Sequence, residues 1–293
     1  IMESFLLLPA WYQYTVIIGF GLIIGSFLNV VLYRFHTGKS LAGSSHCLSC
    51  GTSLRWFELF PLLSYLFLLG RCRSCGSWIP IRYFLIEATT ATLFLFVFLQ
   101  YGLTLLALVV GLLCIVLLMI TVYDLNHMII PNELVVVVAA VSIVYFVLTE
   151  YVNFSFETLL WHMLAALGAF GFYGGLWLIS HGRWIGLGDA KLALPLGFLL
   201  GPLDAFSFVI LSFWVGAIVS LGILALPRVR TFYTNVYLAL SSVWVTCPQG
   251  SIVKYRRYFT MKSEVPFAPF MVIAFLLVLL YNIEVLALMA SLL

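Results

Sequence analysis

The stretch that decides the fold is Trp184-Ile185-Gly186-Leu187-Gly188-Asp189-Ala190-Lys191. It places an acid and a base among glycines, between two long apolar runs. A carboxylate without a partner at the edge of a bilayer is costly to bury, so an acid at such a place points to chemistry or to ion transport. One other aspartate, Asp124, lies in a comparable position. The function therefore depends on whether Asp124 and Asp189 meet.

The composition is that of a membrane protein. Of the 293 residues, 64% are hydrophobic and 9% are charged, whereas a soluble domain has roughly 25% charged residues. Because a helix needs roughly 20 apolar residues to cross a bilayer, we predict an all-α polytopic membrane protein with about eight transmembrane helices. The sixth is the shortest, and it contains Pro195 and Gly197. The expected spans are residues 11–33, 83–100, 103–122, 134–149, 158–179, 191–201, 205–226 and 267–290.

The positions of lysine and arginine predict how the chain is oriented. Cytoplasmic loops carry an excess of positive charge, and here no lysine or arginine lies between Tyr83 and Gly182. With the N-terminus outside, every basic loop and both aspartates lie on the cytoplasmic side. A net charge of +3 gives no reason to expect a nucleic-acid partner. The expected cytoplasmic segments are residues 34–82, 123–133, 180–190 and 227–266.

Two Cys-x-x-C motifs, each followed by glycine, lie in the loop at 34–82. Four thiolates at this spacing can surround zinc tetrahedrally. The alternative is two disulfides or inert thiols, and a reducing cytoplasm argues against the disulfides. Because four cysteines leave no open position for water, the zinc is expected to be structural. The predicted ligands are Cys47, Cys50, Cys72 and Cys75.

The two aspartates could act as a pair. Two carboxylates within hydrogen-bonding range share one proton, so one can activate water while the other polarises a peptide carbonyl. Gly186 and Gly188 would allow close approach of the backbone and a positive φ before Asp189. The alternative is that both aspartates cap helices and lie in water. Lys191 is expected to face lipid headgroups, with a pairing to Asp189 as the alternative.

Several stretches together resemble the type IV prepilin peptidases of bacterial pilus and type II secretion systems. They are residues 25–34 (Gly-Ser-Phe-Leu-Asn-Val-Val-Leu-Tyr-Arg), the cysteine loop from His46 to Glu87, Asp124 with Ile130-Pro131-Asn132, and Gly186 to Lys191. One departure is Pro266-Phe267-Ala268-Pro269, where the family usually has glycine at the position of Ala268. We expect this change to affect a turn without touching the aspartates.

This resemblance implies a membrane aspartyl endopeptidase in which Asp124 and Asp189 are catalytic. It would cut the basic leader from prepilins and pseudopilins at the cytoplasmic face of the bacterial inner membrane. Family members often also methylate the new N-terminus with S-adenosylmethionine. No glycine-rich Rossmann loop is present, so the methyl-donor site cannot be located from the sequence.

We expect residues 1–100 to form an N-terminal region carrying the zinc loop and residues 101–293 to form the peptidase domain. Two other functions remain open. One is a proton-coupled transporter, which predicts acids at mid-bilayer depth and paired broken spans. The other is a non-catalytic scaffold for pilus assembly.

Overall fold

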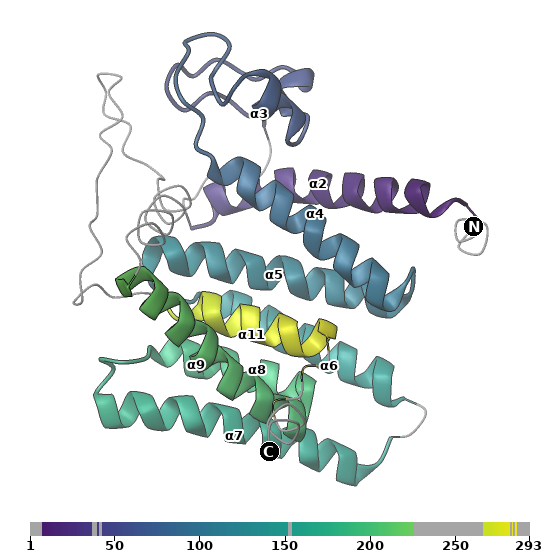
Figure 1. The fold of residues 1–293 in the computed structure, drawn as a ribbon, viewed down its shortest axis with the longest axis vertical. Helices are drawn as coiled ribbons and strands as arrows, with labels where there is room; N and C mark the ends of the chain where they lie inside the picture. The colour runs from purple at the N-terminus through teal and green to yellow at the C-terminus, as the bar shows by residue number, and fades with distance from the viewer. Residues whose placement is uncertain are drawn as a thin grey trace. The chain divides into compact units, whose positions relative to one another are not determined.

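The computed structural model describes residues 8–36, 40, 43–151, 154–225, 266–281, 283 and 285. Most of the predicted loop 227–266 and the end of the last predicted span, 286–290, lie outside these residues. The described chain is helical, and its only extended pairing consists of two isolated β-bridges in the cysteine loop (Figure 1). The main helices are α2 (Ala10–Arg34), α4 (Arg82–Tyr101), α5 (Leu105–His127), α6 (Asn132–Glu150), α7 (Phe156–Ser180), α8 (Leu187–Leu200), α9 (Pro202–Ala225) and α11 (Ala268–Tyr281).

Each predicted span contains a helix, but not all of these helices are long enough to cross a membrane. Six of them, α2, α4, α5, α6, α7 and α9, have the length and the hydropathy of a membrane span. The helices α8 and α11 have 14 residues each, which at 1.5 Å per residue is about 21 Å, against a hydrocarbon core of about 30 Å. The described residues therefore hold six candidate spans, where the sequence predicts about eight.

The outward faces of the long helices are apolar. Large hydrophobic side chains are exposed on all six, as expected for helices that face lipid rather than water. Examples are Trp11, Ile23, Leu108, Val136, Ile179 and Ile218.

The chain divides into two compact units, and the first contains residues up to Leu103. Its helices α2 and α4 pack directly on each other through two glycines of α2. A Cβ added at Gly21 would lie 2.7 Å from the Cα of Ala91, and one added at Gly25 would lie 2.8 Å from the Cα of Glu87. Small residues four positions apart are a common way for membrane helices to bring their backbones together. The cysteine loop, with the short helices η1 (Trp56–Leu59) and α3 (Leu63–Phe67), joins α2 to α4.

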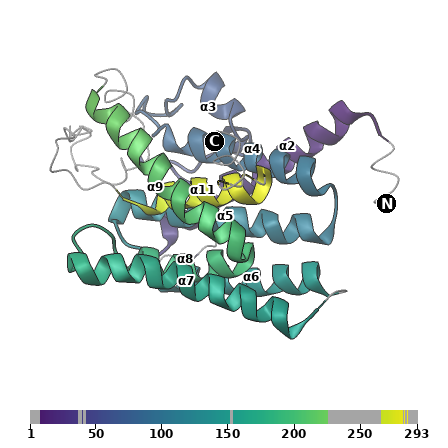
Figure 2. The ribbon, with the colours of Figure 1, turned by 60° about the horizontal axis from the view of Figure 1, so that its bottom comes forward.

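The second unit begins at Thr104, and its described helices pack around α8. This helix contacts α6, α7, α9 and α11, and Figure 2 shows it lying against α7. Gly197 permits that contact, because an added Cβ would lie 3.0 Å from both the Ala165 carbonyl oxygen and the Ala169 Cβ. Despite Pro195, α8 is one uninterrupted helix. The helix α11 packs on α5 and α9 and lies between them in Figure 1.

Candidate active site and metal centre

Asp124 lies in the last turn of α5. The sequence predicts that this span ends at residue 122, but the helix continues to His127 and ends at Met128 in the left-handed conformation. The backbone N–H of Met128 donates to the Asp124 carbonyl at 2.8 Å. The Asp124 side chain is only 5% exposed, so its carboxylate is held inside the helical unit.

Asp189 is the third residue of α8. Its Oδ2 accepts a hydrogen bond from the backbone N–H of Gly186 at 3.1 Å, which caps the helix. Its side chain is 7% exposed. A carboxylate in the first turn also interacts favourably with the helix dipole, so this helix positions one buried acid.

The structure brings the two aspartates together. Asp124 and Asp189 lie close enough for their charges to interact, although 65 positions separate them in the sequence (189 minus 124). Within the described residues, Oδ2 of Asp124 has no hydrogen-bond partner. The capping alternative is half right: Asp189 caps α8, but neither carboxylate lies in water. Two buried acids whose charges interact favour a state in which one is protonated and the other ionised, and such a pair can activate a water molecule.

The two glycines of the central motif act through packing rather than through a positive φ. Gly186 has a φ of −76°, and Gly188 lies inside α8 and has no positive φ, so the predicted left-handed turn is wrong. An added Cβ at Gly188 would lie 3.1 Å from the Cβ of Ile130. Gly188 thus lets α8 approach the segment that follows Asp124.

Lys191 joins the two aspartate motifs. Its Nζ donates to Oδ1 of Asn132 at 3.0 Å, rather than pairing with Asp189. Asn132 is the first residue of α6, and a short connection joins it to the end of α5, where Asp124 lies. Each residue belongs to a different motif of the sequence, and their hydrogen bond is seen only in the folded structure.

The segment that begins α11 reaches Asp124. The backbone N–H of Ala268 hydrogen-bonds the Asp124 carboxylate, so this motif contacts the aspartate pair through its main chain. Ala268 is fully buried and is the first residue of α11. It has no positive φ, so alanine in place of glycine introduces no left-handed strain. A main-chain donor of this kind leaves no signal in the sequence.

The four predicted metal ligands form one cluster. The Sγ atoms of Cys47, Cys50, Cys72 and Cys75 all lie within 4.8 Å of one another, and those of Cys47 and Cys75 are 3.9 Å apart. A tetrahedral zinc ion with Zn–S bonds of about 2.3 Å separates its sulfurs by about 3.8 Å. All four thiols are free of disulfides. The cluster therefore fits a four-sulfur metal centre.

Both halves of the cluster have the same backbone design. In the first, the N–H of Gly51 donates to the Cys47 carbonyl at 2.9 Å, and in the second the N–H of Gly76 donates to the Cys72 carbonyl at 2.8 Å. The two glycines have φ values of +71° and +70°. This left-handed conformation explains why glycine follows each pair of cysteines.

Neighbouring hydroxyl groups favour the thiolates that a metal requires. The side chain of Thr52 lies 3.3 Å from the Cys50 Sγ, and that of Ser77 lies 3.0 Å from the Cys75 Sγ. These side-chain hydrogen bonds lower the pKa of the Cys50 and Cys75 thiols. Metal ligation needs the deprotonated form, which the surroundings favour at Cys50 and Cys75 but not at Cys72, whose pKa is raised to about 11.

Two family models match separate parts of the chain. Residues 19–101 match the model described as Bacterial Peptidase A24 N-terminal domain. Residues 111–221 match the model described as Type IV leader peptidase family. The second match includes both buried aspartates, and the first includes the cysteine cluster.

Curated relatives match over most of the chain. A protein of Bacillus subtilis is 31% identical over 68% of this chain and 78% of its own length. One of Aeromonas salmonicida is 29% identical over 83% of this chain and 93% of its own, and one of Myxococcus xanthus is 35% identical over 70% of this chain and 61% of its own. All three bear the name prepilin leader peptidase/N-methyltransferase. No solved structure gives a significant match.

Proposed function

The chain belongs to the type IV leader peptidase family, and from this premise we propose that it is a membrane endopeptidase that removes the leader peptide from prepilins and pseudopilins. The observation that carries the proposal is the pair of buried aspartates from the ends of two helices. Asp124 and Asp189 interact through their charges while each is less than a tenth exposed. Such a pair of carboxylates is the catalytic dyad of an aspartyl protease.

The chemistry follows from one proton shared by two carboxylates. The ionised aspartate takes a proton from a water molecule, and the resulting hydroxide attacks the carbonyl carbon of the scissile peptide bond. The protonated aspartate donates its proton to the carbonyl oxygen. The other aspartate then passes the proton that it took from water to the leaving nitrogen, and the carbon–nitrogen bond breaks. A hydroxyl of the intermediate returns its proton to the first aspartate, which restores the singly protonated pair. The N–H of Gly186 holds the Asp189 carboxylate, and that of Ala268 holds the Asp124 carboxylate.

We assign Asp189 no fixed role as acid or base. The two carboxylates titrate as a pair, so a single proton belongs to both. Activity is expected to require the singly protonated pair, and it should fall when the pair loses its proton at high pH or gains a second at low pH. This dependence distinguishes the pair from two independent caps.

The second proposed activity is methylation of the N-terminal amine that cleavage releases. It rests on the names of the relatives, which combine peptidase and N-methyltransferase. S-adenosylmethionine would supply the methyl group as an electrophile. The chain must then hold both the donor and the new amine.

We further propose that the cysteine cluster holds a structural zinc ion and that both aspartates face the cytoplasm of the bacterial inner membrane. Residues 1–100 would form the zinc-bearing region, and residues 101–293 the peptidase domain. Six membrane-length helices and the basic residues at 34–82 support this orientation. The bilayer itself is then a partner of the chain, together with its prepilin substrates.

The test is cleavage of a prepilin by the full-length protein in membranes, with the products weighed by mass spectrometry. Replacing either Asp124 or Asp189 by asparagine should lower the rate by about 10²–10⁴-fold, because general acid–base catalysis is lost. A product one methylene heavier than the trimmed pilin would report methylation.

Asp204→Asn is the matched control, since Asp204 also lies in the first turn of a helix but outside the pair. It should cleave normally. Undiminished cleavage by Asp124→Asn or Asp189→Asn would exclude the aspartyl mechanism and restore the scaffold or transporter interpretation.

A further inference from the structure

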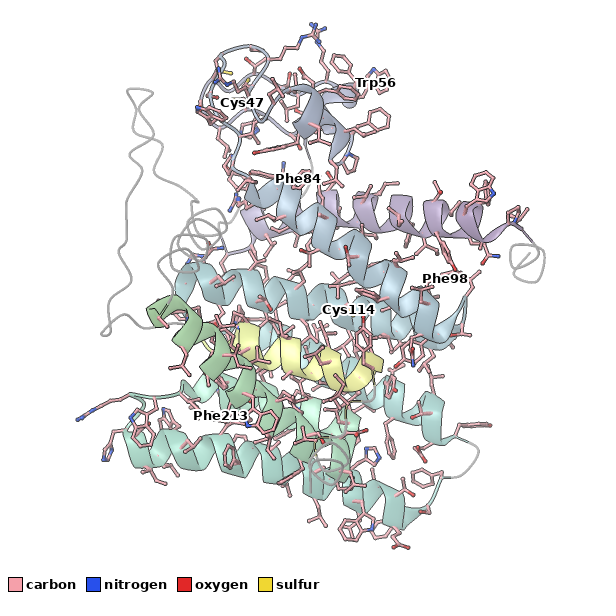
Figure 3. All side chains as sticks on the ribbon, in the orientation of Figure 1. Cys47, Trp56, Phe84, Phe98, Cys114 and Phe213 are labelled. Atoms are coloured by element: carbon pink, nitrogen blue, oxygen red, sulfur yellow. The ribbon has the colours of Figure 1, made fainter. Side chains whose placement is uncertain are left out.

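The cysteine loop carries a surface of large apolar side chains that stays exposed within the described residues. Phe67 is 83% exposed and Leu69 is 78% exposed. In Figure 3, Trp56 lies on the side of the loop that points away from Phe84 of α4. A contiguous apolar surface of this kind marks a site of interaction with lipid or with protein. We call it the outer face of the loop, and it consists of Trp56, Phe60, Leu63, Leu66, Phe67 and Leu69.

The opposite side of α3 packs alongside the start of α4 (Figure 1). The rings of Tyr65 and Phe84 have their centroids 5.5 Å apart. Just before α3, the backbone N–H of Leu62 donates to Oε2 of Glu87 at 2.9 Å, and the side chain of Ser26 on α2 hydrogen-bonds the same carboxylate. The start of α3 is therefore held at the level of Glu87 and Ser26.

That level lies inside the ends of the two spans. Glu87 is about 8 Å along α4 from Arg82, and Ser26 is about 12 Å along α2 from Arg34. Basic residues such as Arg34 and Arg82 mark the cytoplasmic ends of spans, and the headgroup layer on each side of a bilayer is about 5–8 Å thick. The start of α3 thus lies near the edge of the hydrocarbon rather than out in the cytoplasm.

The backbone of this segment is satisfied as lipid requires. Polar backbone groups at membrane depth need partners within the protein. The N–H groups of Ser64, Leu66 and Leu68 each donate at 3.0 Å to the carbonyl four residues earlier. Leu62 precedes the helix, and the Glu87 carboxylate accepts its N–H. The buried acid Glu87 therefore serves a backbone donor that water does not reach.

The charges of the loop are distributed as in a segment that lies in the membrane interface. No lysine or arginine occurs at residues 56–70, whereas Arg55 precedes this stretch and Arg71 and Arg73 follow it. All three arginines are exposed. The one charged residue within the stretch, Glu58, lines the cavity between the loop and α4, and its carboxylate accepts the backbone N–H of Arg55 at 2.8 Å. The outer face is therefore free of charge and flanked by cations.

We propose that the outer face of the loop is inserted into the cytoplasmic leaflet of the bilayer, with lipid acyl chains around Leu66 and Phe67. Arg55, Arg71 and Arg73 lie at the level of the lipid phosphates. The three arginines fit these anions better than they fit the basic leader of a prepilin. The inference requires that α2 and α4 span the membrane, and it does not depend on the peptidase chemistry. It makes the loop an anchor that holds the metal cluster at the membrane surface.

The test is photo-crosslinking of the full-length, metal-loaded protein in vesicles of phosphatidylethanolamine and phosphatidylglycerol, without any prepilin. Phe67 is replaced by p-benzoylphenylalanine, and after irradiation the loop peptides are weighed by mass spectrometry. Phospholipid should be attached at this site severalfold more than at the control site, because acyl chains surround Phe67. The control is the same replacement at Ser44, an exposed residue of the loop outside the apolar stretch.

Equal lipid attachment at both sites, or none at either, would overturn the proposal. So would a Phe67 site that is free of lipid and crosslinks to prepilin once prepilin is added, since the outer face would then bind substrate. If the Phe67 variant does not fold, the unmodified protein in the same vesicles is labelled with a photoactivated carbene probe that partitions into lipid. Label on residues 60–69 supports the insertion, and label confined to the membrane-length helices refutes it.

Discussion

The hydrogen bond between Lys191 and Asn132 fixes the distance between the two aspartate motifs. It joins the start of α8 to the start of α6 with 3.0 Å between Nζ and Oδ1. We expect Lys191→Ala and Asn132→Ala each to lower kcat/KM for prepilin cleavage severalfold. Because both changes break the same contact, the double variant should be no worse than either single one, with a coupling energy of about 0.5–1 kcal/mol for an exposed pair.

Arg183→Ala is the control for that cycle, since Arg183 is an exposed cation shortly before α8 and its backbone N–H donates to the Ser180 carbonyl. Losses that simply add would contradict the coupling.

The aspartates themselves could be predicted, because acids in apolar surroundings are unusual in the sequence. Their supports could not: Lys191 and Asn132 are 59 positions apart, and Ala268 reaches Asp124 through a main-chain N–H that any residue but proline supplies.

At the scale of the helix, Gly21 and Gly25 determine how closely α2 and α4 pack. A Cβ at Gly25 would lie 2.8 Å from the Cα of Glu87, which is backbone and cannot move aside cheaply. Gly25→Ala should therefore destabilise the first unit by about 1–3 kcal/mol. The measurement is thermal unfolding of the purified protein in detergent. Gly19→Ala is the matched control on the same helix, because nothing lies within 4 Å of an added Cβ there. A control as damaging as the Gly25 variant would count against helix packing as the cause.

The cysteine loop depends on its four sulfurs rather than on a core of its own, since η1 and α3 contain no buried residue. We expect one zinc ion per chain by elemental analysis, and Cys47→Ser or chelation should remove it and make the loop sensitive to protease. Cys114→Ala should keep the metal, because Cys114 is buried in α5 outside the cluster. A loop that stays protected after chelation would show that the metal is dispensable for its fold.

The lengths of the helices could not be predicted from the sequence as well as their positions. Hydropathy places a helix at each predicted span, yet it does not separate a spanning helix from a short buried one. The helix α8 is apolar because α6, α7 and α9 surround it, and not because lipid does. The cysteine spacing, in contrast, predicts the four-sulfur cluster correctly. Each Cys-x-x-Cys pair forms a tight turn with glycine at a positive φ, and two such turns can place four sulfurs around one metal ion.

For the whole molecule, the distribution of positive charge predicts which ends of the helices face the cytoplasm. Residues at the two ends of α6 test this orientation, since Ile129 is 64% exposed before the helix and Tyr151 is 80% exposed after it. Cysteines placed at these positions can be labelled with a membrane-impermeant maleimide and identified by peptide mass. The Tyr151→Cys site should react in spheroplasts, and the Ile129→Cys site only in inverted vesicles. The basic residues at 34–82 are predicted to be inside, so the chain crosses outward along α4, inward along α5 and outward again along α6. Labelling of both sites from one side would mean that α6 does not cross the membrane. A reversed pattern would place the aspartates outside the cell and overturn the proposed orientation.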